Sequence, residues 1–248
     1  MKTFNRREFL AAGAAATAVA PGLYLLSVSV KAAPEATATA GDQQARSDVR
    51  WGMLVDASKC KTGCEECIKA CNQENAINEI PNNPRQGSQW IRKIELKPKQ
   101  GTAPNLSLPM MCQHCSEPPC VDVCPTGASF KRVDGIVLVD RHTCIGCRYC
   151  MMACPFKARS LVHQPLTQQN PQVPRGMGCV ESCTFCVHRV DRGLRPACSE
   201  ACPEGALTFG DLNDSNSEIS RKLASANSVQ VRADLKLNTA VRYQGLGG

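Results

Sequence analysis

The sequence predicts an α+β fold in which two similar cysteine-rich modules are joined in tandem, with insertions and a C-terminal extension. The 248-residue chain contains 17 cysteines, and sixteen of them form four runs of four. Three of these runs end in Cys-Pro, and short segments of strand composition flank them. Such self-similarity is typical of an internal repeat, so the modules are expected to share one architecture.

The composition limits the classes of function. Aromatic residues make up only 4% of the chain, so cohesion must come partly from elsewhere, and bound metal supplies it when ligand binding contributes to folding. The net charge is +7, of which residues 1–32 carry +3 (four basic side chains and one acidic), leaving +4. No basic run with interleaved aromatic residues occurs, which argues against nucleic-acid binding.

The N-terminus predicts an export signal over residues 1–32. Asn5-Arg6-Arg7-Glu8-Phe9-Leu10 precedes an alanine-rich apolar stretch, and Lys31-Ala32-Ala33 ends it with small residues, as in a twin-arginine signal peptide. An uncleaved membrane anchor is the alternative. Cleavage is favoured because Gly13, Pro21 and the alanines make the stretch weakly hydrophobic. This route exports proteins already folded around a cofactor, which explains many cysteines without disulfides in a periplasmic protein.

The first half of the exported chain starts with a small, polar, flexible leader over residues 33–50. A strand is expected at Trp51–Val55, directly before the first run. That run has spacings x3, x2 and x3 and consists of Cys60, Cys64, Cys67 and Cys71. An insertion over residues 72–111 follows, with a strand near Trp90–Leu96.

The second and third runs are separated by a predicted hairpin. Its strands, Ala128–Arg132 and Ile136–Val139, flank an Asp-Gly turn. The second run is spaced x2, x4, x3 and consists of Cys112, Cys115, Cys120 and Cys124. The third, spaced x2, x2, x3, consists of Cys144, Cys147, Cys150 and Cys154. Residues 164–178 are polar with three prolines and predict an exposed docking loop.

The last part of the chain carries the fourth run and the extension. The run is spaced x2, x11, x3 and consists of Cys183, Cys186, Cys198 and Cys202. A capping box from Ser215 to Glu218 predicts a helix through Ala226. Alternating apolar residues from Val229 to Leu237 predict a half-buried strand. No apolar stretch near the C-terminus is long enough to span a bilayer.

The cysteine spacing indicates iron–sulfur chemistry. The third run, C-x2-C-x2-C-x3-C-P, has the spacing with which bacterial ferredoxins hold cubane clusters, the fourth cysteine serving a second cluster. Sixteen ligands make four cubanes, and all-thiolate zinc sites are the rival interpretation. Cys179 is interpreted as a spare thiol, with a register shift of the fourth run as the alternative. The histidines have no ligand spacing and are interpreted as surface or second-layer residues: His114, His142, His163 and His188.

The order of the four runs resembles the four-cluster ferredoxin subunits of respiratory membrane complexes, over residues 51–220. The resemblance implies that runs one and four share two clusters and that runs two and three share two more. The first module then comprises residues 51–111 with 179–210, the second 112–178, and the extension 211–248. The implied ligand sets are Cys60, Cys64, Cys67 and Cys202; Cys71, Cys183, Cys186 and Cys198; Cys112, Cys115, Cys120 and Cys154; and Cys124, Cys144, Cys147 and Cys150.

Within this family, three stretches resemble the exported subunits of the sulfite-reductase-associated (Dsr) membrane complexes. They are Arg50–Asp56, Cys67–Cys71 and Gln169–Pro174. The longer gap after Cys60 departs from the family pattern. The first ligand set is therefore open to three readings: a 4Fe–4S cluster, a 3Fe–4S cluster or no cluster.

No nucleophile, acid–base pair or phosphate loop stands out, so we expect an electron relay without a catalytic site of its own. The resemblance implies a hetero-oligomeric complex with an integral quinone-interacting membrane subunit and a periplasmic multihaem cytochrome c. A molybdopterin-reductase relay subunit is the second hypothesis, and an envelope zinc or redox-sensing protein the third. Three cations near the third run either favour reduced clusters or are surface charge: Arg148, Lys157 and Arg159.

Overall fold

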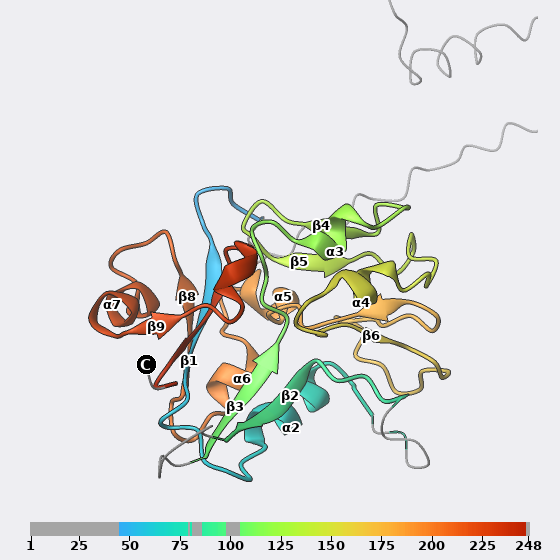
Figure 1. The fold of residues 1–248 in the computed structure, drawn as a ribbon. Coiled ribbons are helices and arrows are strands. Elements are labelled where there is room, and N and C mark those ends of the chain that lie inside the picture. The colour runs from blue at the N-terminus through green and yellow to red at the C-terminus, as the bar shows by residue number, and fades with distance from the viewer. Residues whose placement is uncertain (1–44, 79, 81–85, 98–104, 247–248) are drawn as a thin grey trace, which may run out of the picture. The chain divides into compact units, whose positions relative to one another are not determined.

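The computed structural model describes residues 45–78, 80, 86–97 and 105–246, so the predicted signal and most of the leader lie outside the described residues. Its largest sheet has four strands in the order β8-β1-β10-β9 (Figure 1). They are β1 (Trp51–Asp56), β8 (Leu207–Asp211), β10 (Val241–Gln244) and β9 (Ser228–Val229). β1 pairs antiparallel with β8 and parallel with β10. The α+β class is confirmed.

Strand β1 lies in the middle of this sheet, and its sequence explains why. Every residue of Trp51–Asp56 after the tryptophan is buried, as expected for an apolar run covered on both faces. Trp51 stacks on Phe209 of β8, with ring centroids 5.2 Å apart. The predicted strand at Trp51–Val55 is therefore confirmed.

Among the described residues, three two-stranded sheets complete the β structure. β2 (Ile91–Leu96) pairs with β3 (Leu106–Met111), β4 (Ser129–Lys131) with β5 (Val137–Val139), and β6 (Ser160–Leu161) with β7 (Val180–Glu181). The predicted strand near Trp90–Leu96 and the predicted hairpin are both present. The loop over residues 164–178 is mostly partly or fully exposed and contains no helix or strand.

Short helices follow the cysteine loops and pack in pairs. α2 (Glu66–Glu74) lies against α6 (Ala197–Glu200), which connects the first run to the fourth. α3 (Pro119–Asp122) lies against α4 (Tyr149–Ala153), which connects the second run to the third. α5 (Val187–Val190) follows Cys186. The fold thus joins segments that are far apart in the sequence.

The C-terminal extension differs from its predicted form. Helix α7 (Glu218–Ser225) is present, but its N-cap is Ser217, whose hydroxyl accepts from Ser220 N at 3.2 Å; the predicted cap at Ser215 is wrong. The predicted strand over Val229–Leu237 is also wrong. It is reduced to β9 and the 3₁₀ helix η2 (Ala233–Leu235), because left-handed residues, Arg232 and Lys236 among them, interrupt the extended backbone.

The extension supplies β10 instead, in which Val241 and Tyr243 are fully buried. The Tyr243 hydroxyl donates to Pro109 O at 3.3 Å and accepts from Gln113 Nε2 at 3.1 Å. These contacts fix β10 beside the second cysteine run. Within the described part of the chain, every helix is too short or too polar to cross a bilayer.

Candidate iron–sulfur cluster sites

The four runs share one backbone feature. The residue directly before the second cysteine is left-handed in every run, with φ of 78° at Gly63, 43° at His114, 69° at Gly146 and 52° at Phe185. This conformation turns the chain sharply between the first two thiols. The extra residue of the first run therefore leaves that turn unchanged, because Gly63 occupies the same place before Cys64.

A second repeat follows the three Cys-Pro pairs. The sequences are Cys124-Pro-Thr-Gly-Ala128, Cys154-Pro-Phe-Lys-Ala158 and Cys202-Pro-Glu-Gly-Ala206. In each, the fourth residue is left-handed and its N–H donates to the cysteine carbonyl at 3.2–3.3 Å. Proline at the second position and glycine at the fourth favour such a type I turn. The turn ends the cysteine helix and directs the chain back to the cluster site.

The first module brings thiols of runs one and four together. Cys60, Cys64, Cys67 and Cys202 line one cavity with Lys93. Burial raises the pKa of Cys67 to about 11; Lys93 lowers it, and the neighbouring thiols raise it further. Lys93 Nζ donates to Cys60 Sγ at 2.8 Å. The thiols of the implied first set are thus neighbours in the fold.

The second set of this module is deeper. Burial raises the pKa of Cys183 and Cys198 well above the ordinary range, and Cys71 and Cys186 add to the effect as neighbouring thiols. All four side chains are at most 5% exposed. Asn75 Nδ2 donates to Cys71 Sγ at 3.6 Å.

The second module combines runs two and three. Burial raises the pKa of Cys115 to about 12, and Cys112, Cys120 and Cys154 reinforce the shift as neighbours. Burial likewise raises the pKa of Cys120 to about 12. Cys154, from the third run, thus lies among thiols of the second.

The last set lies nearest the surface. Burial raises the pKa of Cys150, Arg159 lowers it, and Cys144 and Cys124 raise it, so these three thiols are neighbours. Cys147 is exposed on the same loop. Backbone N–H groups point at the sulfurs: Ser129 N is 3.3 Å from Cys124 Sγ, and Val180 N is 3.4 Å from Cys144 Sγ. Hydrogen bonds of this kind tune a cluster's potential.

These donor sets fit cubane clusters. Buried thiols with raised pKa values stay protonated in the absence of metal. The positive charge of bound iron favours the thiolate form and so deprotonates them. Within the described ranges, no three His, Cys, Asp or Glu side chains converge on one point as a single ion requires. A cubane instead takes one thiolate at each of four corners. When bound, such a cluster accepts and releases single electrons.

The spare cysteine and the histidines lie in different environments. Cys179 lies beside the third run, and its thiol is 3.1 Å from Arg141 O, which suits a spare thiol. His142 and His163 are exposed. His188 bonds Glu74 Oε1 at 2.7 Å, next to Cys186.

Of the three cations, Arg148 and Lys157 are exposed, whereas Arg159 is buried. The sequence did not predict the burial of Arg159 or the Lys93–Cys60 contact, because neither follows from local spacing.

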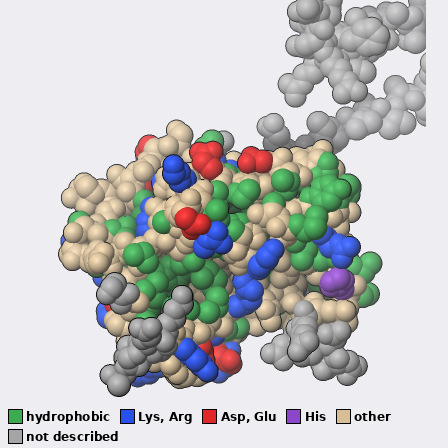
Figure 2. Space-filling view, in the orientation of Figure 1, with side chains coloured by type: hydrophobic (Ala, Val, Ile, Leu, Met, Phe, Trp, Pro, Cys, Tyr) green, Lys and Arg blue, Asp and Glu red, His purple; other side chains and the backbone are tan. Residues whose placement is uncertain are grey.

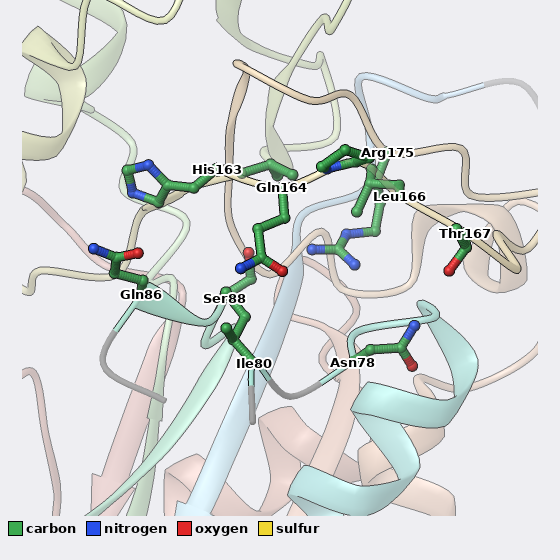
Figure 3. A pocket seen from close by; sticks show the side chains of 11 residues that line it. Asn78, Ile80, Gln86, Ser88, His163, Gln164, Leu166, Thr167 and Arg175 are labelled. Atoms are coloured by element: carbon green, nitrogen blue, oxygen red, sulfur yellow. The ribbon is translucent and has the colours of Figure 1, made fainter. Parts of the chain in front are cut away.

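A surface pocket elsewhere does not add a reaction site. Its labelled side chains come from residues 78–88 and 163–175, and Gln164 points toward Ser88 (Figure 3). Arg175, the one Lys or Arg among its described lining residues, already bonds Glu181 with two nitrogens and Ala76 O with the third. Arg175 therefore anchors the loop over residues 164–178 to the core.

The fold and the four sets of thiols define a ferredoxin-type electron-transfer protein with sixteen cysteines for four 4Fe–4S clusters. Known proteins give the same class: the model of the 4Fe-4S dicluster domain matches residues 105–212. The chain is 41% identical to the Hdr-like menaquinol oxidoreductase iron-sulfur subunit 1 of Archaeoglobus fulgidus, over 98% of this chain and 99% of that protein.

Two further relatives have similar identity. Protein NrfC of Escherichia coli is 41% identical over 81% of this chain and 83% of that protein. A tetrathionate reductase subunit of Salmonella typhimurium is 40% identical over 70% of this chain and 63% of that protein. The chain therefore belongs to the ferredoxin-type iron–sulfur subunits of respiratory oxidoreductases, and its role is electron transfer.

Proposed function

We propose that this chain is the exported iron–sulfur subunit of a Dsr-type respiratory complex of sulfur metabolism. It relays electrons between a periplasmic multihaem cytochrome c and a quinone-interacting integral membrane subunit. The sixteen run cysteines are its cluster ligands, in the four crossed sets described above. The chain holds and connects the clusters and has no catalytic site of its own.

The observation that carries the relay is the crossing of the runs. Cys202 joins the thiols of run one, and Cys71 joins those of run four. Cys154 likewise joins the thiols of run two, and Cys124 those of run three. Each run therefore contributes to two neighbouring sites, which supports pairs of clusters close enough to exchange electrons.

A partner surface is proposed at the exposed end of the second module. Large apolar side chains are exposed around Cys147: Ile145 (67%), Tyr149 (54%) and Met152 (66%). Hydrophobic side chains gather on the part of the molecular face where Figure 1 places α3 and the loop before α4 (Figure 2). Exposed apolar patches mark interaction sites. An electron-exchange partner seated here would reach the most accessible cluster.

A quinone-linked assembly is supported by one relative. The Archaeoglobus fulgidus protein that matches almost the whole chain is named as a subunit of a menaquinol oxidoreductase. A molybdopterin reductase is the second candidate, because other relatives are named as subunits of tetrathionate and dimethyl sulfoxide reductases. The two candidates differ in the partner that the chain binds.

Purification of the tagged full chain from membranes of its native host tests the proposal. A multihaem cytochrome and a quinone-interacting membrane subunit should co-purify, with visible absorption that dithionite bleaches. A molybdenum-containing chain in their place would overturn the Dsr-type assignment, and zinc without the absorption would overturn the relay. Met152→Glu should abolish the association. Val229→Glu places the same charge at another exposed apolar residue (44%), on β9, and should leave the association intact.

A further inference from the structure

Arg159 is a buried cation, and the described residues provide it with no carboxylate counter-ion. Arg159 is only 5% exposed. Nε, Nη1 and Nη2 are all buried, and none has a hydrogen-bond partner of standard geometry in the described part of the chain. Burying a guanidinium without an anion is strongly unfavourable, so this position requires a negative group that the side chains of Asp and Glu do not supply.

The titratable groups near Arg159 include cysteine thiols from two sets and the buried imidazole of His114. Burial lowers the pKa of this arginine, but Cys120, Cys112 and Cys150 raise it, with a net rise. Cys112 and Cys120 belong to one set of the second module, and Cys150 belongs to the other. The guanidinium therefore lies where both sets can reach it.

The repeat explains how the side chain arrives there. Arg159 is the fifth residue after Cys154, and the fifth residues after Cys124 and Cys202 are Ser129 and Leu207. All three are buried, with exposures of 5%, 3% and 5% in that order. The turn after each Cys-Pro thus directs this position inward. The other two repeats hold a neutral residue there, so a charge at this position is peculiar to the junction of the second module's two sites.

We propose that Arg159 is a positioning residue shared by both clusters of the second module, whose charge stabilises their reduced forms. The inference rests on the proposed relay and deepens it. Reduction adds one electron and no atom, so the negative charge beside Arg159 rises by one. A fixed cation in a buried, weakly screened place favours that change. The electron comes from the neighbouring site or, in the test, from dithionite.

The test is a redox titration of the isolated full chain with its clusters loaded, followed by electron paramagnetic resonance. Signals are assigned with Cys154→Ser and Cys202→Ser, which alter one cluster in each module. In Arg159→Met, reduction of both second-module clusters should become about tenfold less favourable, which is about 59 mV for a one-electron couple. The first-module clusters should keep their potentials. Arg159→Lys, which keeps the positive charge, should have nearly native potentials. Arg148→Gln, which removes an exposed cation, should shift the potentials little.

The outcomes separate the inference from a packing role. Unchanged second-module potentials in a fully loaded Arg159→Met protein would overturn it, and so would an equal shift of all four clusters. If Arg159→Met cannot hold its clusters, Arg159→Lys decides. A loaded lysine protein with nearly native potentials supports the charge, whereas loss of clusters in both variants assigns Arg159 to packing. Because no partner is needed, failure here is distinct from failure of the co-purification that tests the relay.

Discussion

The rings of His114 and Phe185 stack with their centroids 3.7 Å apart and an interplanar angle of 26°. Each ring belongs to the left-handed residue directly before the second cysteine of its run. The stack therefore connects run two, in the second module, with run four, in the first. His114 Nδ1 also accepts from Val137 N at 3.0 Å, which fixes the orientation of the imidazole.

Truncation of this stack should destabilise the junction between the modules. Phe185 is 1% exposed, and Phe185→Ala should lower the free energy of unfolding by about 3–5 kcal/mol. Since each kcal/mol corresponds to about 2–4 °C for a chain of this size, the visible absorption should be lost at a clearly lower temperature. Phe185→Leu is the matched control and should cost less. Equal melting of the alanine variant and the parent would show that the stack contributes little.

The crossed ligand sets predict which cluster each fourth cysteine serves. Cys154→Ser should damage the cluster of Cys112, Cys115 and Cys120, and Cys124→Ser that of Cys144, Cys147 and Cys150. Each variant should lose up to about four of about sixteen irons, measured by iron analysis with electron paramagnetic resonance. Loss of the cluster of its own run in either variant would contradict the crossing.

Cys179→Ser is the control for these substitutions. Its thiol is 3.1 Å from a backbone carbonyl and lies beside the third run. The variant should therefore keep the full iron content and all four resonance signals. An altered signal of the cluster that includes Cys144 would instead identify Cys179 as a substitute ligand.

Arg132 should be important for stability because it forms ion pairs with two carboxylates. It bonds Asp134 Oδ2 at 2.8 Å and Asp191 Oδ1 at 2.7 Å, and the Asp134 side chain is only 1% exposed. Arg132→Ala leaves the buried carboxylate of Asp134 unpaired, which should lower the free energy of unfolding by about 3–5 kcal/mol. The loss should lie toward the lower end of this range, because the other partner, Asp191, retains contact with water. Urea denaturation measures the change in the free energy of unfolding. Arg46→Ala, in an ion pair exposed on both sides, should have no measurable effect.

Cluster retention should depend on pH in a defined direction. Burial raises the pKa of Cys67 to about 11 and of Cys115 to about 12, so without iron these thiols are protonated at neutral pH. Iron binding releases those protons, and cluster retention should strengthen as the pH rises and weaken as it falls. Chelator-driven bleaching between about pH 6 and 9 measures this. A rate independent of pH would contradict it, and Cys179→Ser should show the parent's dependence.

Local signals in the sequence predicted the features that depend on local chemistry. β1 and the β4–β5 hairpin follow from composition and turn residues. Features set by distant pairing were missed: β10 is four residues long, and β1 is its parallel neighbour from the other end of the chain. The alternation from Val229 to Leu237 suggested a strand, but left-handed residues override it. The burial of Arg159 likewise depends on how runs two and three meet within the second module, which no spacing within one run reveals.

The parallel pairing of β1 with β10 sets an order in time. Runs two and three lie within residues 112–154, so the second module can close while the ribosome is still making the rest of the chain. The sheet behind the first module is complete only when Val241, 188 positions further along the chain, aligns with Met53. A nascent chain stalled before β10 would carry one finished module and one that is still open.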